Sequence, residues 1–249
     1  MKVVSCYSIK GGVGKTATSV NIAYMAAEAG YRTLLVDLDP QGASSFYFRV
    51  KPSKKQRGKR LINASQSLFK QIKASDFENL DIIPAHMSFR HFDNLLGQLK
   101  KSNNRLSKTF ETLSKDYDLI VLDCPPTLSY LSEAVFTASD VIFVPVIPTT
   151  LSERTYEQLQ LFFKKNEYPK KRIVPFFTMV QAQKSLHKST MKSMNNRYAR
   201  FLKTQIPFSA DIENMGEHRS PVGVFAKHRP ANKAYKALWN EMEKKIRKS

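Results

Sequence analysis

The sequence predicts an α/β fold: a single domain over residues 1–249, with a mostly parallel, twisted sheet flanked by helices. Short β-rich apolar runs alternate with helical stretches along the chain, which is the pattern of parallel strands joined by crossover helices. With 249 residues, 42% of them hydrophobic, the chain can fill one large core. No internal repeat or low-complexity linker divides the sequence, and only residues 49–60 have the composition of a loop.

The first half of the chain predicts three strands and two helices. Residues 2–8, "KVVSCYS", form an apolar run that leads into a glycine-rich stretch, so we expect a strand followed by a helix. The next β-rich runs are "RTLLVDLD" and the shorter "LDIIPA". The expected elements are strands at 32–39 and 80–85 and helices over 14–29 and near 88–101.

The second half predicts three more strands, at 117–126, 140–148 and 172–180. Residues 152–166 predict a helix with Ser152 as its N-cap. Helical spacing of apolar residues predicts two further helices. One carries Met191, Met194, Tyr198 and Phe201, and a terminal helix over about 231–246 carries Tyr235, Leu238, Trp239, Met242 and Ile246.

The chain is strongly basic. Forty Lys and Arg against twenty-one Asp and Glu give a net charge of +19. Such an excess indicates a polyanionic partner, either nucleic acid or an anionic membrane surface, although composition alone leaves open a merely soluble basic surface. Residues 49–60 hold seven basic residues and no acid, residues 168–210 hold nine and no acid, and a third cluster begins at Lys227.

The sequence contains no sign of a membrane span or of secretion. No apolar run approaches the roughly 18 residues of a transmembrane helix, and the start of the chain lacks a signal-peptide pattern. Cys6 and Cys124 each lie in a strand-like apolar segment, which favours buried free thiols over a disulfide or a metal site. We therefore expect a cytoplasmic protein.

A phosphate-binding loop is predicted at "KGGVGKT", residues 10–16. The loop follows a strand and opens a helix, so its backbone N–H groups and the helix N-terminus can surround phosphates. Lys15 would reach the β- and γ-phosphates, and the Thr16 hydroxyl would bind Mg²⁺. Ile9 replaces the first glycine of the usual pattern, and Lys10 adds a second lysine. We expect nucleotide contacts from Lys10, Gly11, Gly12, Val13, Gly14, Lys15, Thr16 and Ala17.

Three aspartates lie where predicted strands end. Asp37 and Asp39 close "LLVDLD", and Asp123 closes "LIVLD". Ligands of open α/β sheets bind outside the C-terminal ends of the strands, where a carboxylate can help to hold Mg²⁺. Any one of these aspartates could be a helix cap or a turn residue. Together with the glycine-rich loop they predict a nucleoside triphosphate bound with Mg²⁺.

These motifs carry a family resemblance. "KGGVGKT", "VDLDPQG", "DCPP", "VPVIPT" and "PANKAYKALWNEM" resemble the ParA/MinD family of deviant Walker P-loop ATPases, and the ParA branch more closely. The resemblance covers Met1 to about Glu243. It implies ATP and Mg²⁺ as cofactors, ATP hydrolysis, and an ATP-dependent homodimer in which Lys10 touches the phosphates of the partner's ATP.

The resemblance also implies roles for single residues. Asp39 would orient the attacking water, so that Lys10, Lys15 and Asp39 form the catalytic set. Asp37 would support the metal and the adjoining loop, and Asp123 would complete the Mg²⁺ shell. The expected metal site is Thr16, Asp37, Asp39 and Asp123. Met179 and Pro207 match the place where the family holds adenine.

The function expected is an ATPase switch that binds DNA without sequence preference, associates with the nucleoid and positions a cargo. The cargo could be a plasmid, a chromosome region or a large protein assembly, and an adaptor protein would stimulate hydrolysis. A solvated helix face explains any single lysine, but the absence of acids over 168–210 favours phosphate binding. The expected DNA-binding residues are Lys184, Lys188 and Lys192 at four-residue spacing, with Arg197, Arg200, Lys227, Arg229, Lys233 and Lys236.

Two other functions share the phosphate-binding loop. A MinD-like membrane role would use the terminal helix and its basic tail "KKIRKS", but this helix joins the core pattern directly, so membrane binding is not expected. An amide-forming enzyme similar to cobyrinic acid or dethiobiotin synthases would need a distinct substrate site and has no use for a charge of +19. The absence of a CxxC pair disfavours an iron–sulfur carrier. The role of residues 49–60 and the identities of cargo and adaptor do not follow from the sequence.

Overall fold

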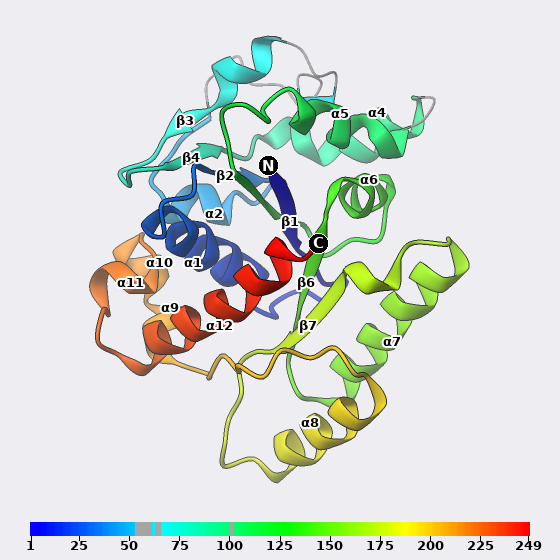
Figure 1. Ribbon diagram of the computed structural model, residues 1–249, viewed down its shortest axis with the longest axis vertical. Coiled ribbons are helices and arrows are strands. Elements are labelled where there is room, and N and C mark those ends of the chain that lie inside the picture. The colour runs from blue at the N-terminus through cyan, green and yellow to red at the C-terminus, as the bar shows by residue number, and fades with distance from the viewer. Residues whose placement is uncertain (53–60, 63–65, 100–101) are drawn as a thin grey trace.

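The computed structural model describes residues 1–52, 61–62, 66–99 and 102–249 (Figure 1). Most of the basic segment 49–60 thus lies outside the described residues. Seven strands form one sheet in the order β3-β4-β2-β5-β1-β6-β7. The strands are β1 (Lys2–Cys6), β2 (Thr33–Asp37), β3 (Lys73–Ala74), β4 (Leu80–Ile83), β5 (Leu119–Asp123), β6 (Val141–Val146) and β7 (Ile173–Phe177).

All neighbouring strands run parallel except β3, which pairs antiparallel with β4 at one edge. The chain crosses from β1 to β2 on one side, and β6 and β7 extend the sheet on the other. The strand order therefore reverses at β1, and ligands of such sheets bind at this reversal. This confirms the fold class expected from the sequence.

Side chains alternate between the two faces of the sheet. Val3, Leu34 and Ile120 pack into one core, and their neighbours Val4, Leu35 and Val121 pack into the other. Both faces are thus buried, which explains why the strands are apolar throughout. The helices are α1 (Lys15–Glu28), α2 (Ala43–Tyr47), α4 (Phe92–Gly97), α5 (Arg105–Glu111), α6 (Tyr130–Ala138), α7 (Thr150–Lys165), α8 (Ser185–Arg197), α9 (Ala210–Glu213), α10 (Met215–His218), α11 (Val222–Phe225) and α12 (Pro230–Arg247).

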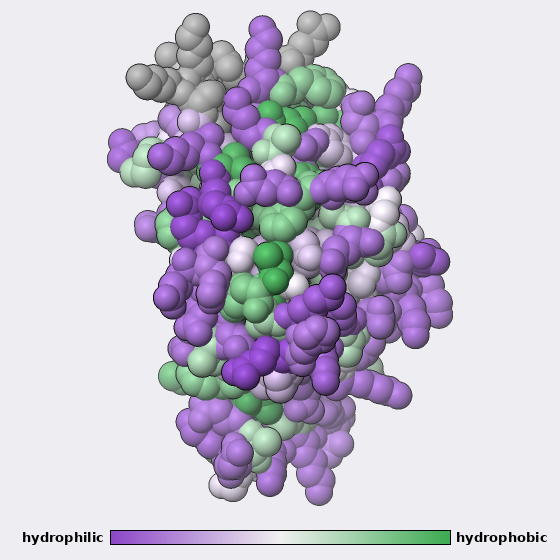
Figure 2. Space-filling model, turned by 90° about the vertical axis from the view of Figure 1, so that its left-hand side faces the viewer, coloured by the Kyte–Doolittle hydropathy of each residue, from purple (hydrophilic) through white to green (hydrophobic). Residues whose placement is uncertain are grey.

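The helices divide between the two cores. Residues of α1, α10, α11 and α12 line one core, and residues of α4 to α8 line the other. Figure 1 shows α1 and α12 side by side over one face of the sheet. Of the described helices, none is long and apolar enough to cross a membrane. Figure 2 shows that the side bearing α10 and α11 is mostly hydrophilic, with hydrophobic side chains in small groups.

Several predicted boundaries differ from the structure. The helix expected over 88–101 is a 3₁₀ turn, Met87–His91, followed by the short α4. Helix α7 begins earlier than predicted, because the extended residue Thr149 takes the N-cap position and Ser152 lies inside the first turn. Other 3₁₀ turns at Gln66–Gln71, Ser102–Asn104 and Lys170–Arg172 join the main elements.

Candidate functional site

The loop between β1 and α1 has a backbone that requires glycine. Gly12 and Gly14 have φ angles of 69° and 87°, a region that side chains with a Cβ rarely adopt. Gly14 is also the N-cap of α1, and it supplies no side-chain hydrogen bond to this helix N-terminus. The free N–H groups at this helix N-terminus are therefore available for an anion.

Lys15 reaches back across this loop. Its side chain is buried, and Nζ donates a hydrogen bond to the Lys10 carbonyl at 3.1 Å. Burial lowers the pKa of Lys15, while the nearby carboxylates of Asp123 and Asp39 act in the opposite direction. An anion in the loop would supply the negative charge that this buried ammonium lacks.

Lys10, the second lysine, is half-buried and held by its own chain. Its Nζ lies 3.2 Å from Oγ of Ser152, in the first turn of α7. The Ser152 hydroxyl in turn accepts a hydrogen bond from Oγ1 of Thr149 at 3.1 Å. Sequence reasoning missed Ser152 as a partner of Lys10, because the residues are 142 positions apart.

Asp37 and Asp123 face each other at the C-terminal ends of adjacent strands. They are opposite residues in the β2–β5 register, and both are fully buried. Burial raises the pKa of each carboxyl group, and Asp123 raises the pKa of Asp37 further because two like charges lie close together. The arrangement concentrates negative charge beside the phosphate-binding loop.

Hydroxyl groups surround these two carboxylates. Ser44 and Ser19 donate to Asp123 at 2.5 and 3.2 Å, and the Thr16 hydroxyl also bonds to Asp123. Ser45 donates to Oδ2 of Asp37 through its backbone N–H at 2.9 Å and its hydroxyl at 2.7 Å. The sequence analysis missed Ser19, Ser44 and Ser45, although two of them directly follow "DPQGA".

One oxygen remains available for a cation. Oδ1 of Asp37 is buried and has no hydrogen-bond partner among the described residues. No group of three or more His, Cys, Asp or Glu gathers in the described part of the chain. Mg²⁺ in nucleotide sites keeps several waters and binds the phosphates of the ligand. A site with only a few protein oxygens beside a phosphate-binding loop is therefore suited to this ion. The residues present fit that ion.

Asp39 stands at the edge of this group and is partly exposed. Its Oδ1 accepts a hydrogen bond from the N–H of Gln41 at 3.0 Å, and its carbonyl accepts one from Gly42 at 2.9 Å. Gly42 has a φ of 70° and is the N-cap of α2. A tight turn thus holds a carboxylate next to the buried pair, with access to solvent.

Met179 and Pro207 lie together beside the loop. Residues 180 and 207 form an isolated parallel bridge, and Met179 and Pro207 line a cavity of about 40 Å³ next to Gly14 and Ala17. This volume is too small for a purine base, so adenine binding here requires side chains to move. Phe208, which also lines the cavity, is half-exposed and therefore free to move.

The basic residues expected to bind DNA lie on two separate helices. Lys188 and Lys192 are exposed on α8, with Lys184 at its N-cap. Lys233 and Lys236 are exposed on α12, after Lys227. Arg200, also exposed, follows α8.

Two of the nine basic residues are already paired. Arg197 lies 2.6 Å from Glu157 and 3.7 Å from Glu153, both on α7. Arg229 lies 3.4 Å from Asp211. The absence of acids from residues 168–210 of the sequence does not show these pairs, because the fold brings the acids from other segments.

The sequence is similar to a known protein family and to several characterised proteins. A family model described as an AAA domain (AAA_31) matches residues 1–174. The sporulation initiation inhibitor protein Soj of Bacillus subtilis is 38% identical over 146 residues, covering 58% of each chain. The chromosome partitioning protein ParA of Caulobacter vibrioides is 32% identical over 151 residues, covering 59% of this chain and 56% of ParA. The match thus spans little more than half the length of these relatives.

Solved structures match over almost the whole chain. A plasmid partition protein of Borrelia burgdorferi has a TM-score of 0.80 at 22% identity, covering 98% of this chain and 99% of that one. The Cyanothece McdA–ATP complex has a TM-score of 0.84 at 17% identity, covering 98% and 96%. Cobyrinic acid a,c-diamide synthase of Mycobacterium smegmatis with ADP and magnesium has a TM-score of 0.81 at 22% identity, covering 97% and 93%. At these identities the likeness concerns the fold.

Proposed function

Because the chain belongs to the AAA_31 family, and within it to the ParA-type deviant Walker ATPases, we propose that it is a Mg²⁺-dependent ATPase that positions a cargo. ATP binding drives homodimerisation, the dimer binds DNA without sequence preference, and an adaptor protein stimulates hydrolysis. The activity belongs to one ATPase domain over residues 1–249 and takes place in the cytoplasm, on the nucleoid. The buried Lys15, held across a glycine loop beside two facing carboxylates, carries the proposal.

The phosphates of ATP lie against the N–H groups at Gly12 to Thr16, with Lys15 on the β- and γ-phosphates. Mg²⁺, held by Thr16 with Asp37 and Asp123, neutralises phosphate charge when it is bound. Asp37 and Asp123 remain ionised there because a cation offsets the burial that raises their pKa values. Adenine lies at Met179 and Pro207 after Phe208 moves.

Asp39 orients the attacking water. Its carboxylate is the one member of the acidic group that reaches solvent, and a turn fixes it in place. A base must lie within hydrogen-bond reach of the water whose proton it accepts, and a carboxylate at the end of β2 lies on the phosphate side of the sheet. Lys15 stabilises charge on the transferred phosphoryl group.

Lys10 acts on the partner's nucleotide. Lys15 already occupies the cis position, and Lys10 points instead to Ser152, away from the loop interior. A dimer that places ATP between two copies would draw Lys10 from Ser152 to the opposite phosphates. A lysine in trans then links dimerisation to the presence of a triphosphate, as an arginine finger links two proteins in phosphoryl transfer.

DNA binding involves the exposed lysines of α8 and α12. The charge of +19 indicates a polyanion, and Lys184, Lys188 and Lys192 have no ion-pair partner among the described residues. Arg197 and Arg229 contribute less, because acids already neutralise them. A MinD-like membrane role has less support, since the apolar face of α12 packs into the core down to Ile246.

The proposed function is tested by fluorescence anisotropy on two unrelated duplexes, with ATP and with ADP, over a salt series. ATP should tighten binding to both duplexes equally, and the slope of log affinity against log salt should roughly double. The reason is that the dimer contacts twice as many phosphates as the monomer, at about −0.9 per phosphate. Lys184, Lys188 and Lys192 changed together to Glu should abolish DNA binding and leave ATP-dependent dimerisation intact.

The matched control changes Lys164, Lys165 and Lys171 to Glu, with the same change of charge at exposed positions that are not in the proposed DNA-binding set. It should retain most of the affinity. A DNA affinity that is the same with ATP and with ADP, or that is much higher for one duplex than for the other, contradicts the proposal.

A further inference from the structure

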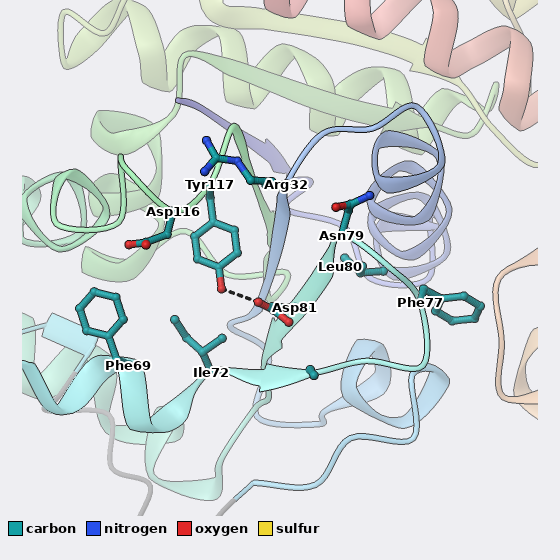
Figure 3. A pocket seen from close by; sticks show the side chains of 10 residues that line it. Arg32, Phe69, Ile72, Phe77, Asn79, Leu80, Asp81, Asp116 and Tyr117 are labelled. Atoms are coloured by element: carbon teal, nitrogen blue, oxygen red, sulfur yellow. Dashed lines mark hydrogen bonds between the residues drawn. The ribbon is translucent and has the colours of Figure 1, made fainter.

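A hollow of about 700 Å³ lies at the end of the sheet opposite the phosphate loop (Figure 3). Its residues Arg32, Leu80 and Tyr117 precede or begin β2, β4 and β5, whereas the site carboxylates end β2 and β5. A ligand in this hollow would therefore not contact the ATP site.

The hollow combines apolar walls with carboxylates. Figure 3 shows the Tyr117 ring across its centre, with the hydroxyl directed to Asp81 at 2.7 Å and with Phe69 and Ile72 on the opposite side. Phe69 is 46% exposed, so an aromatic side chain faces water. Asp116 is exposed beside it and forms no ion pair with any described residue.

This hollow is the first of three that run along the same edge of the molecule. It shares Phe77 and Asn79 with a second hollow, which also includes Glu78 and Glu28. The second shares Glu28 with a third, lined by Met25, Trp239 and Glu243. The three together are called the edge groove below. Its lining combines apolar side chains such as Phe69 and Phe77 with acidic ones such as Asp116 and Glu78.

The charge of the edge groove is opposite to that of the protein. Five acidic residues line it, against Arg32 and Lys236, in a chain with 40 basic and 21 acidic residues. One of the five, Glu243, is paired with Arg247 at 2.7 Å. Arg32 is neutralised by Asp118 at 2.8 Å, and Glu78 is exposed and unpaired within the described residues. At physiological salt a charge is screened beyond about 8 Å, so a ligand in the groove responds to these carboxylates more than to the distant basic surfaces.

We propose that the edge groove binds an extended segment of another protein that presents both basic and apolar side chains to it from every second position. The basic side chains pair with Asp81, Asp116, Glu78 and Glu28, and the apolar ones contact Phe69, Phe77 and the ring of Tyr117. Alternate side chains of an extended peptide entering successive pockets are a known mode of recognition. This inference does not rest on the proposed ATPase function, because the groove shares no residue with that site.

The probe is a short fluorescein-labelled peptide in which every second residue is serine and the positions between are arginine and leucine in turn, so that one face carries both. It is added to the nucleotide-free protein at physiological salt. A matched peptide with glutamate in place of arginine is the comparison. A protein of net charge +19 attracts the glutamate peptide by its overall charge and repels the arginine peptide. Tighter binding of the arginine peptide therefore requires a local acidic site, and this is the expected result.

Two variants locate the binding. Glu78→Lys with Asp116→Lys reverses exposed charges in the groove, and Phe69→Ala removes its exposed ring. Each variant should lower the affinity for the arginine peptide. The charge reversal should lower it on the order of tenfold, because like charges then face each other. The control, Glu167→Lys with Glu217→Lys, makes the same change of net charge at exposed positions outside the groove and should bind as the parent does.

Circular dichroism checks that each variant is folded. The inference is overturned if the glutamate peptide binds the parent as tightly as the arginine peptide. It is equally overturned if groove variants bind as well as the parent, or if the control variant loses as much affinity as the groove variant.

Discussion

At the scale of one residue, Asp37 lowers the stability of the free protein and provides an oxygen that can bind a cation. Its side chain is fully buried, one oxygen accepts two hydrogen bonds from Ser45, and the other oxygen has no partner among the described residues. A buried polar atom without a partner costs about 1–3 kcal/mol, and more when it is charged. Such a cost is expected where a cation completes the coordination of the free oxygen.

Asp37→Asn should therefore stabilise the protein in the absence of nucleotide and Mg²⁺. Burial raises the pKa of Asp37 in the folded state, so folding is favoured where the carboxyl is protonated, and this contribution is lost as the pH rises above the unfolded pKa of about 3.9. The advantage of the asparagine variant should be near zero at pH 4 and should grow to about 1–3 kcal/mol at pH 8.

Thermal and urea unfolding in EDTA, at pH values from 4 to 8, measure this difference. Asp116→Asn makes the same chemical change at an exposed position and should leave the pH profile unchanged. A variant at position 37 that is less stable than the parent at pH 8 would mean that Asp37 is satisfied in the free protein.

The site residues that belong to a recognisable sequence motif could be predicted from the sequence. Lys15, Thr16, Asp37 and Asp123 were placed by motif and by strand ends, and the structure brings them together. The serines that support them were missed, because a single serine has no periodicity and its partner is fixed only by the tertiary fold. Ser44, for example, bonds to a carboxylate 79 positions away.

The helices show the same limit at the scale of elements. Helices α1, α7, α8 and α12 were predicted from signals in their own sequences. These are the glycine-rich loop before α1, a helical stretch with a capping serine for α7, and helically spaced apolar residues for α8 and α12. Tyr198 and Phe201, expected on the same helix as Met194, lie beyond the end of α8 at Arg197. Helices α9, α10 and α11 have four residues each and were missed. One turn cannot show a period, and such turns are stabilised by contacts with distant residues rather than by their own sequence.

Helix α11 offers a test of these contacts. A Cβ added at Gly223 would lie 2.7 Å from Cε1 of Tyr24 on α1 and 3.2 Å from Oδ1 of Asn232 on α12. The Tyr24 ring cannot easily retreat, because its hydroxyl bonds to Glu28 and its ring packs against Phe77. Gly223 is therefore the residue that lets α11 approach α1.

Gly223→Ala should destabilise the protein by about 1–3 kcal/mol, the usual cost of overpacking a core. Gly216→Ala is the matched control, since nothing lies within 4 Å of a Cβ there. That substitution should be neutral or slightly stabilising, because alanine favours a helix and restricts the unfolded chain. Urea unfolding measures both, and equal stabilities for the two variants would contradict the described packing.

The whole molecule separates its ATP site from its other candidate sites. The phosphate loop and its carboxylates lie at the C-terminal ends of the strands, whereas the edge groove begins at the opposite end of the sheet and reaches α12, where Lys236 lines it. The proposed DNA-binding lysines of α8 lie outside the groove. In the proposed function these sites act together through a change of assembly, because Lys10 of one protomer is proposed to contact the nucleotide of another.

The central claim is that Lys10 makes dimerisation depend on ATP. Light scattering after size-exclusion chromatography, with ATP and Mg²⁺ and with ADP and Mg²⁺, tests it in three variants beside the parent. Titration of a fluorescent ATP analogue shows separately whether each variant binds nucleotide. Lys15→Ala should lose both nucleotide binding and dimerisation, because it removes the cis phosphate contact.

Lys10→Ala should bind nucleotide through Lys15 yet remain monomeric with ATP, whereas the parent should double in mass with ATP and not with ADP. Ser152→Ala removes the resting partner of Lys10, 3.2 Å away, and the hydrogen bond from Thr149 at the start of α7. It should dimerise as the parent does, and so controls for disturbance of α7. A Lys10→Ala protein that dimerises with ATP as fully as the parent would contradict the account.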